Sequence, residues 1–170
     1  MNLLFFLQNG YSKQQSDEVV AWVGNNQSRF NELLNVFLHS TDYKIVQRAA
    51  WSLSYAAVNY PVLIHFHYQK LIQELNAEGK PAAVRRNILR IFDQIPQIPE
   101  SYHGIIMDVC FKCIANPQEA IATQAFALGI LHKLSKIYPE ILHELKTTIA
   151  VLLPNAAPAF KSRAKKILKE

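Results

Sequence analysis

Three histidines occupy matching positions along the chain, and histidine side chains can ligate a metal ion or transfer a proton. His65, His103 and His143 each follow a proline by four residues. If helices carry them side by side, neighbouring imidazoles would lie roughly 8–10 Å apart. All three could not ligate one ion, because metal–nitrogen bonds are about 2 Å long. We therefore expect each imidazole to bond a backbone carbonyl at the edge of an apolar stripe, and we expect no metal site. The alternative is that neighbouring pairs share a ligand or, when protonated, an anion.

The two cysteines, Cys110 and Cys113, form a C-x-x-C pair. A redox pair needs its first cysteine at a helix N-terminus, where the helix dipole lowers the thiol pKa. Both cysteines are predicted to lie well inside a helix, and a zinc site would need two further ligands. We therefore expect them to fill the core. No phosphate-binding loop, nucleophile elbow or zinc-protease motif occurs in the sequence, so no catalytic residue and no cofactor are predicted.

The elements that carry these residues repeat along the chain. The segment VQRAAWSL begins at Val46, and similar segments begin at Val84, Ile121 and Phe160, after 38, 37 and 39 residues. A constant period in this range is typical of stacked helical pairs, in which each pair buries the apolar face of its neighbour. The repeat therefore predicts an all-α superhelix in which Val46, Val84 and Ile121 are buried.

Apolar spacing and prolines divide the chain into a cap and four antiparallel helical pairs. The cap is expected at residues 1–26, with a short apolar helix at residues 2–8 that covers the first pair. The pairs are expected at residues 27–58, 61–95, 99–137 and 139–169, with the first helix of the first pair at 27–39.

Individual residues predict where helices begin and end. Ser16 is expected to cap a helix that ends near Val23, and Asp42 to cap the second helix of the first pair. Pro61 is expected in the first turn of the next helix, where its missing N–H costs nothing. Gly79 is expected to end that helix, and Pro81 to open the one after it.

The composition is that of one ordered domain of 170 residues, half of them hydrophobic. The formal net charge is +5, and the last ten residues contribute +4, with five basic residues against Glu170 alone. The basic segment Lys161–Lys169 is predicted to be a terminal capping helix, with a membrane-surface or nucleic-acid role as the alternative. No segment is long enough to cross a membrane. Two cysteines do not make a disulfide framework, and the N-terminal residues lack the pattern of a signal peptide. The expected location is therefore the cytoplasm.

The segments Asp42…Val46-Gln47-Arg48-Ala49-Ala50 and Val84-Arg85-Arg86 resemble the second helix of HEAT repeats, the armadillo-like α-solenoid family. The resemblance covers about residues 27–169. The later copies depart from the pattern, because Ile121 is followed by Ala122 and Phe160 by Lys161. The turn before Val84 also has Lys80-Pro81 where the family favours an acidic residue. The resemblance implies an all-α HEAT-like solenoid whose second helices line a concave face.

That implied arrangement places polar and aromatic side chains of the second helices on the concave face. Arginine is suited to binding carboxylates or phosphates, and an exposed tryptophan is a strong anchor for a partner. The alternatives are a solvated helix face for the charges and inter-repeat core for the tryptophan. The predicted partner-binding residues are Gln47, Arg48, Trp51, Arg85, Arg86 and Arg90.

The sequence thus predicts a non-enzymatic scaffold that binds a protein or an extended, acidic peptide. The alternative is nucleic-acid binding through a basic groove, as in HEAT-like DNA alkylation-repair proteins. A partner in the membrane is not expected. The process that the chain serves and its oligomeric state do not follow from these patterns.

Overall fold

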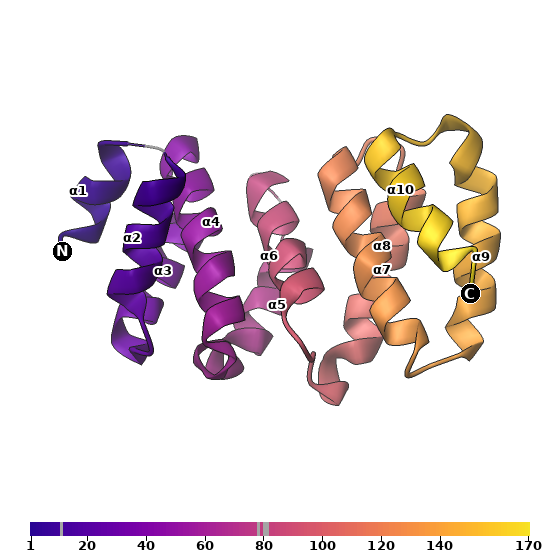
Figure 1. Cartoon of the computed structure of the whole chain (residues 1–170), viewed down its shortest axis with the longest axis horizontal. Coiled ribbons are helices and arrows are strands. Elements are labelled where there is room, and N and C mark those ends of the chain that lie inside the picture. The colour runs from indigo at the N-terminus through magenta and orange to yellow at the C-terminus, as the bar shows by residue number, and fades with distance from the viewer. Residues whose placement is uncertain (11, 78, 80–81) are drawn as a thin grey trace. The chain divides into compact units, whose positions relative to one another are not determined.

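A computed structural model describes residues 1–10, 12–77, 79 and 82–170. Throughout these residues the regular structure is helical, without strands. Figure 1 shows the helices in chain order. They form two compact units, Met1–Pro96 and Gln97–Glu170, and each unit is described by itself.

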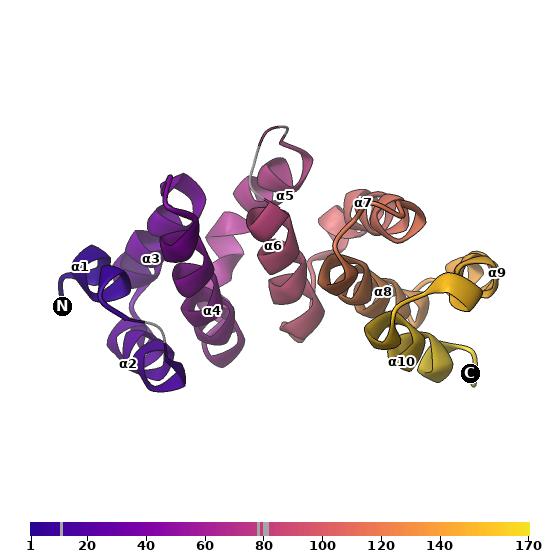
Figure 2. The ribbon, with the colours of Figure 1, turned by 90° about the horizontal axis from the view of Figure 1, so that it is seen from above.

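The first unit is built around one long central helix, α4. Its helices are α1 (Leu3–Gln8), α2 (Lys13–Val23), α3 (Gln27–His39), α4 (Tyr43–Asn59), the 3₁₀ helix η1 (Pro61–His67), α5 (Tyr68–Asn76) and α6 (Ala82–Gln94). Helix α4 packs against α1, α2, α3 and α6, and α5 packs against α6. Within this unit, α3 and α5 lie on one side while α4 and α6 lie on the other (Figure 2). The short helix α1 covers the first pair, as predicted.

The second unit has the same two-sided arrangement. Its helices are η2 (Glu100–Tyr102), α7 (His103–Ala115), α8 (Ile121–Ser135), α9 (Glu140–Leu152), η3 (Leu153–Asn155) and α10 (Pro158–Ile167). Helix α8 packs against α7, α9 and α10. Within the unit, α7 and α9 lie on one side and α8 and α10 on the other (Figure 2).

Local capping residues explain most of the helix starts in the first unit. The side chains of Asn2, Asn26 and Asp42 each accept a hydrogen bond from a backbone N–H of the first turn. The prediction that Ser16 caps α2 is wrong, because Ser12 is the cap and accepts from the backbone N–H of Gln15. Ser16 instead belongs to the buried stripe of α2, and its hydroxyl lies 3.2 Å from that of Ser52.

Prolines mark the helix starts, but not always as the first residue of an α-helix. Pro61 begins the 3₁₀ helix η1, and regular α-helical bonding starts only at Tyr68. Pro139 is the N-cap of α9, and Pro158 is the first residue of α10. The opening predicted near Pro81 lies outside the described residues, and α6 is described from Ala82.

The predicted burial of the repeated apolar residues is correct at Val46 and Val84 in the first unit and wrong at Ile121 in α8. Val46 and Val84 are 1% and 2% exposed, whereas Ile121 is 53% exposed. Ile121 is the first residue of α8, as Tyr43 is of α4, and Tyr43 is 56% exposed. Aligning the two helix starts places Gln124, not Ile121, at the position of Val46.

The buried residues of α8 confirm this register. Thr123, Ala127, Leu128 and Leu131 of α8 correspond to Ile45, Ala49, Ala50 and Leu53 of α4, and all eight are buried. The repeat pattern aligns Ile121 with Val46 because both are apolar, but Ile121 lies in the first turn of α8, which is exposed.

A candidate partner-binding face on α4 and α6

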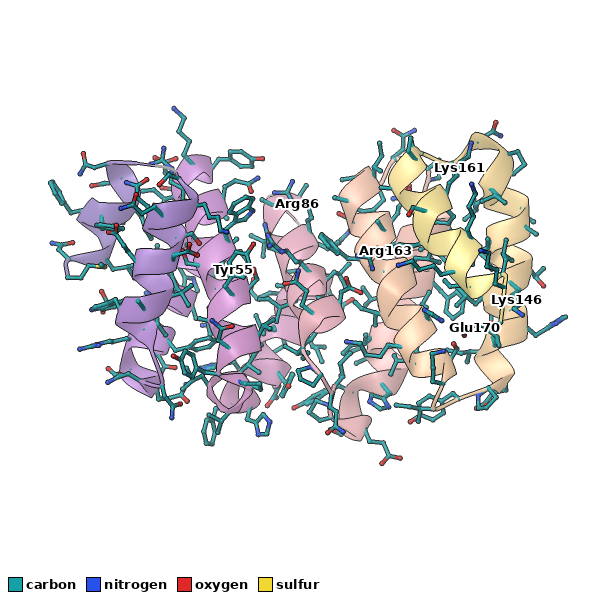
Figure 3. All side chains as sticks on the ribbon, viewed as in Figure 1. Tyr55, Arg86, Lys146, Lys161, Arg163 and Glu170 are labelled. Atoms are coloured by element: carbon teal, nitrogen blue, oxygen red, sulfur yellow. The ribbon has the colours of Figure 1, made fainter. Side chains whose placement is uncertain are left out.

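Two adjacent helices of the first unit, α4 and α6, carry all six predicted partner-binding residues. The helices pack side by side, because small and branched apolar residues line the seam between them. Residues off this seam are left at the outer edge of the packed layer. Figure 3 shows Tyr55 on α4 and Arg86 on the neighbouring α6.

Arg90 joins the two helices through aromatic rings of α4. Its guanidinium carbon lies 5.5 Å from the ring centre of Trp51 and 5.3 Å from that of Tyr55. Trp51 and Tyr55 are four residues apart, so they lie on the same face of α4. A cation over two aromatic faces is held electrostatically by the ring quadrupoles. Trp51 and Arg90 are half-buried, and Tyr55 is exposed.

Gln47 connects Arg86 to the start of α4. Its amide nitrogen donates a hydrogen bond to the hydroxyl of Tyr43, and its amide oxygen accepts one from the guanidinium of Arg86. A shallow depression beside this group is lined by Tyr43, Lys44, Gln47 and Arg48. Both amide atoms of Gln47 are therefore oriented by neighbours, and Arg86 is held one helical turn from Arg90.

The structure places Arg48 and Arg85 in supporting positions. Arg48 Nη1 donates to the backbone oxygens of Leu7, at 2.6 Å, and Gln8, at 2.9 Å. Arg85 Nε donates to the backbone oxygen of Leu75 at 3.3 Å. The last carbonyls of a helix have no partner within the helix. These two arginines therefore donate hydrogen bonds to backbone carbonyls at the ends of α1 and α5.

The other four predicted residues, together with Tyr43 and Tyr55, form a group that we call the α4–α6 face: Tyr43, Gln47, Trp51, Tyr55, Arg86 and Arg90. Among the described residues, no carboxylate forms an ion pair with Arg86 or Arg90. The face therefore presents two cations, two exposed tyrosine rings and one tryptophan edge. Sequence reasoning missed Tyr43 and Tyr55, although their positions four residues before Gln47 and after Trp51 could have indicated them.

Comparison with known protein families decides the family. A family model described as a HEAT repeat domain matches residues 6–170. The chain belongs to the HEAT repeat family. The predicted fold class, an all-α HEAT-like solenoid, is thereby confirmed. Comparisons with curated proteins and with solved structures found no match.

The three matching histidines of this HEAT repeat chain have different surroundings. His65 and His143 are exposed, whereas His103 is 5% exposed. His103 Nε2 lies 2.7 Å from the backbone oxygen of Ile98, and Nδ1 lies 3.0 Å from the hydroxyl of Tyr138. The predicted bond to a backbone carbonyl thus occurs at His103. The described residues contain no group of three or more histidine, cysteine, aspartate or glutamate side chains that could hold a metal ion.

A fourth histidine, His67, lies in a polar group that the sequence did not indicate. Its Nε2 is 2.8 Å from Oδ1 of Asn31 and 3.2 Å from Nε2 of Gln27, and its ring stacks on Phe30. Burial lowers the pKa of His67, and the nearby charge of Lys70 lowers it further. These contacts hold η1 against α3, so we interpret the role of His67 as structural.

Cys110 and Cys113 are buried in α7, which confirms the prediction that they fill the core. Both are part of a helical interior, distant in sequence from the start of α7 at His103. Neither thiol therefore lies at the N-terminal position that activates a cysteine.

Helix α10 packs against α8 through one apolar face. Phe160, Ala164 and Ile167 are buried, and α10 lies against α8. The guanidinium of Arg163 lies 5.6 Å from the ring centre of Phe126 on α8. An arginine over an aromatic ring therefore joins successive second helices in both units. None of the described helices combines the length and the apolar character needed to cross a membrane.

Proposed function

We propose that this HEAT repeat chain is a non-enzymatic scaffold that binds an extended, acidic protein segment along the α4–α6 face. HEAT repeats generally mediate protein interactions as scaffolds. The observation that supports the acidic ligand is the pair Arg86 and Arg90, which are half-buried and have no carboxylate partner among the described residues. Guanidinium groups bind carboxylates through paired, parallel hydrogen bonds.

The spacing of the two arginines favours an extended ligand. Four residues of α-helix advance about 6 Å along its axis. In an extended peptide, side chains two residues apart lie on the same side, about 6.5 Å from each other. A segment with acidic residues at alternate positions would therefore place one carboxylate at Arg86 and one at Arg90.

The aromatic residues would contribute contact area beside the charges. Trp51 and Tyr55 hold the guanidinium of Arg90 before the ligand binds, so less side-chain entropy is lost on binding. Tyr43 and Gln47 lie at the Arg86 end, where the amide and the hydroxyl can bond to a peptide backbone. Aromatic and arginine side chains dominate the binding energy of many interfaces.

The test uses an array of extended peptides that carry Asp or Glu at alternate positions, with Asn or Gln peptides as neutral counterparts. Binding is measured by fluorescence anisotropy for the wild-type chain and for the double variant Arg86→Gln, Arg90→Gln. A hydrogen bond to a charged group contributes about 1.5–3 kcal/mol, so the double variant should bind acidic peptides at least tenfold more weakly.

The matched control is the double variant Lys13→Gln, Lys112→Gln, which removes the same charge from exposed positions on α2 and α7. It should bind as the wild type does. The proposal is wrong if neutral peptides bind as well as acidic ones, or if the two double variants behave alike.

A further inference from the structure

Helix α10 carries a second group of cations, separate from the α4–α6 face. We call Lys161, Lys165, Lys166 and Lys169 the α10 lysine face. Lys161 and Lys165 are four residues apart, and Lys169 lies in the turn that follows the helix. Lys165, Lys166 and Lys169 are exposed, and Lys161 is half-buried with its Nζ 3.4 Å from the backbone oxygen of Pro154. Figure 3 shows Lys161 near the start of α10.

Among the residues that the structure describes, no ion pair joins a lysine of the α10 lysine face to a carboxylate. Glu170 is the one acidic residue in the last ten. Its carboxylate lies 2.9 Å from Nε2 of His132 on α8 and accepts, at 2.8 Å, from Nζ of Lys136, the C-cap residue of α8. Like charges one helical turn apart destabilise a helix. The like charges of Lys161, Lys165 and Lys169 along α10 are thus not offset by an ion pair within the part of the chain that the structure describes.

The α10 lysine face differs from the α4–α6 face in what surrounds the cations. The aromatic residue of α10, Phe160, is buried, so no ring is exposed among the lysines. Stacking on single-stranded bases requires exposed aromatic side chains. Insertion into a membrane surface requires an exposed apolar face. Here Phe160, Ala164 and Ile167 are already buried in the contact with α8. Leu168, in the turn after α10, is 39% exposed, but one side chain does not make an apolar face.

We propose that the α10 lysine face binds the phosphate backbone of a nucleic-acid duplex without reading its sequence. Lysine binds phosphates as a compact point charge on a flexible stem, so it can follow a line of phosphates without a fixed bidentate geometry. Phosphate contacts position a protein on a duplex but carry no sequence information. Four lysines set an upper limit of about four phosphate contacts.

The measurement is the affinity of the wild-type chain for a fluorescent 20-base-pair DNA duplex of arbitrary sequence, as a function of salt concentration. Each phosphate contact adds about −0.9 to the slope of the logarithm of the binding constant against the logarithm of the salt concentration. With up to four contacts, we expect a slope of about −3 to −4. The triple variant Lys161→Gln, Lys165→Gln, Lys169→Gln should bind at least tenfold more weakly at low salt. Its slope should be smaller by about one unit for each lysine removed.

A matched triple variant, Lys13→Gln, Lys70→Gln, Lys112→Gln, makes the same change in net charge on other helices. It should retain the wild-type slope and nearly all of the affinity. Circular dichroism checks that both variants are folded, and glutamine keeps the helix propensity of lysine. The variant Arg86→Gln, Arg90→Gln should bind the duplex as the wild type does, because the two proposals concern different surfaces.

The proposal is overturned if the duplex does not bind at low salt, or if the two triple variants lose affinity equally. It is also overturned if poly-glutamate of matched charge competes as well as the duplex, since the ligand would then be an acidic polypeptide. Binding to vesicles with anionic lipids that exceeds binding to the duplex, and that the α10 triple variant abolishes, would assign the face to a membrane instead.

Discussion

The hydroxyl of Tyr138 and the imidazole of His103 meet at 3.0 Å in the second unit, with the Tyr138 ring at 85° to the imidazole. The other imidazole nitrogen, Nε2, donates to the backbone oxygen of Ile98, because a carbonyl can only accept. In the neutral ring, Nδ1 is therefore the acceptor for the Tyr138 hydroxyl. Tyr138, two residues before α9, is thereby joined to the start of α7.

Replacing Tyr138 with phenylalanine should destabilise the chain. The change keeps the ring but leaves Nδ1 of the buried His103 without a donor, which costs about 1–3 kcal/mol. Urea unfolding followed by far-ultraviolet circular dichroism measures the difference in free energy of unfolding. Tyr55→Phe is the control, because Tyr55 is exposed and its hydroxyl is not part of a described hydrogen bond. The account of His103 is contradicted if the two substitutions change the free energy equally.

Local signals in the sequence were sufficient for much of the first unit. Helix α3 has the predicted bounds, residues 27–39, and Asp42 caps α4 as expected. Caps and apolar stripes depend on residues within one or two turns, so sequence spacing reports them directly. Ser16 failed as a predicted cap because Ser12 and Ser16 are one turn apart, and only packing shows which of them is buried.

The predictions for the binding residues depended on contacts that spacing does not contain. Arg48 and Arg85 satisfy backbone carbonyls at the ends of α1 and α5, which lie 40 and 10 residues away in sequence. Trp51 was open to two interpretations, and its position under Arg90 depends on how α4 and α6 are aligned. The register of α8 was missed because an exposed isoleucine and a buried valine look alike in an apolar pattern.

Glu170 should titrate at an unusually low pH. The hydrogen bond from Lys136, and secondly the His132 imidazole 2.9 Å away, lower its pKa from 4.5 to about 2. A carboxylate whose pKa is lower in the folded state stabilises the fold above the unfolded pKa, and this contribution is lost as the pH falls toward the folded pKa. The wild type should therefore gain stability over Glu170→Gln between about pH 2 and pH 4.5, and the difference should be constant above that range.

The measurement for Glu170 is the carboxyl carbon chemical shift followed by NMR through the acid range. Lys136→Met should raise the pKa of Glu170, because it removes the hydrogen bond with the largest effect. Lys112→Met serves as the control, since Lys112 pairs with Asp108 on α7. A Glu170 pKa that is the same in the wild type and in Lys136→Met would show that this ion pair does not form in solution.

His67 should make the stability of the first unit fall as the pH decreases, in the same direction as Glu170 but in a higher pH range. Burial, and secondly the charge of Lys70, lower its pKa below 6.5, so folding favours the neutral imidazole. A group of this kind stabilises the fold above the unfolded pKa, and the contribution is lost as the pH falls below about 6.5. His67→Gln should therefore make the free energy of unfolding less dependent on pH below about pH 6.5. Imidazole shifts measured by NMR test the cause separately, because Lys70→Gln should move the pKa of His67 upward. An unchanged His67 pKa in that variant would leave burial as the only cause, and a pKa at or above 6.5 in the wild type would contradict the contacts with Asn31 and Phe30.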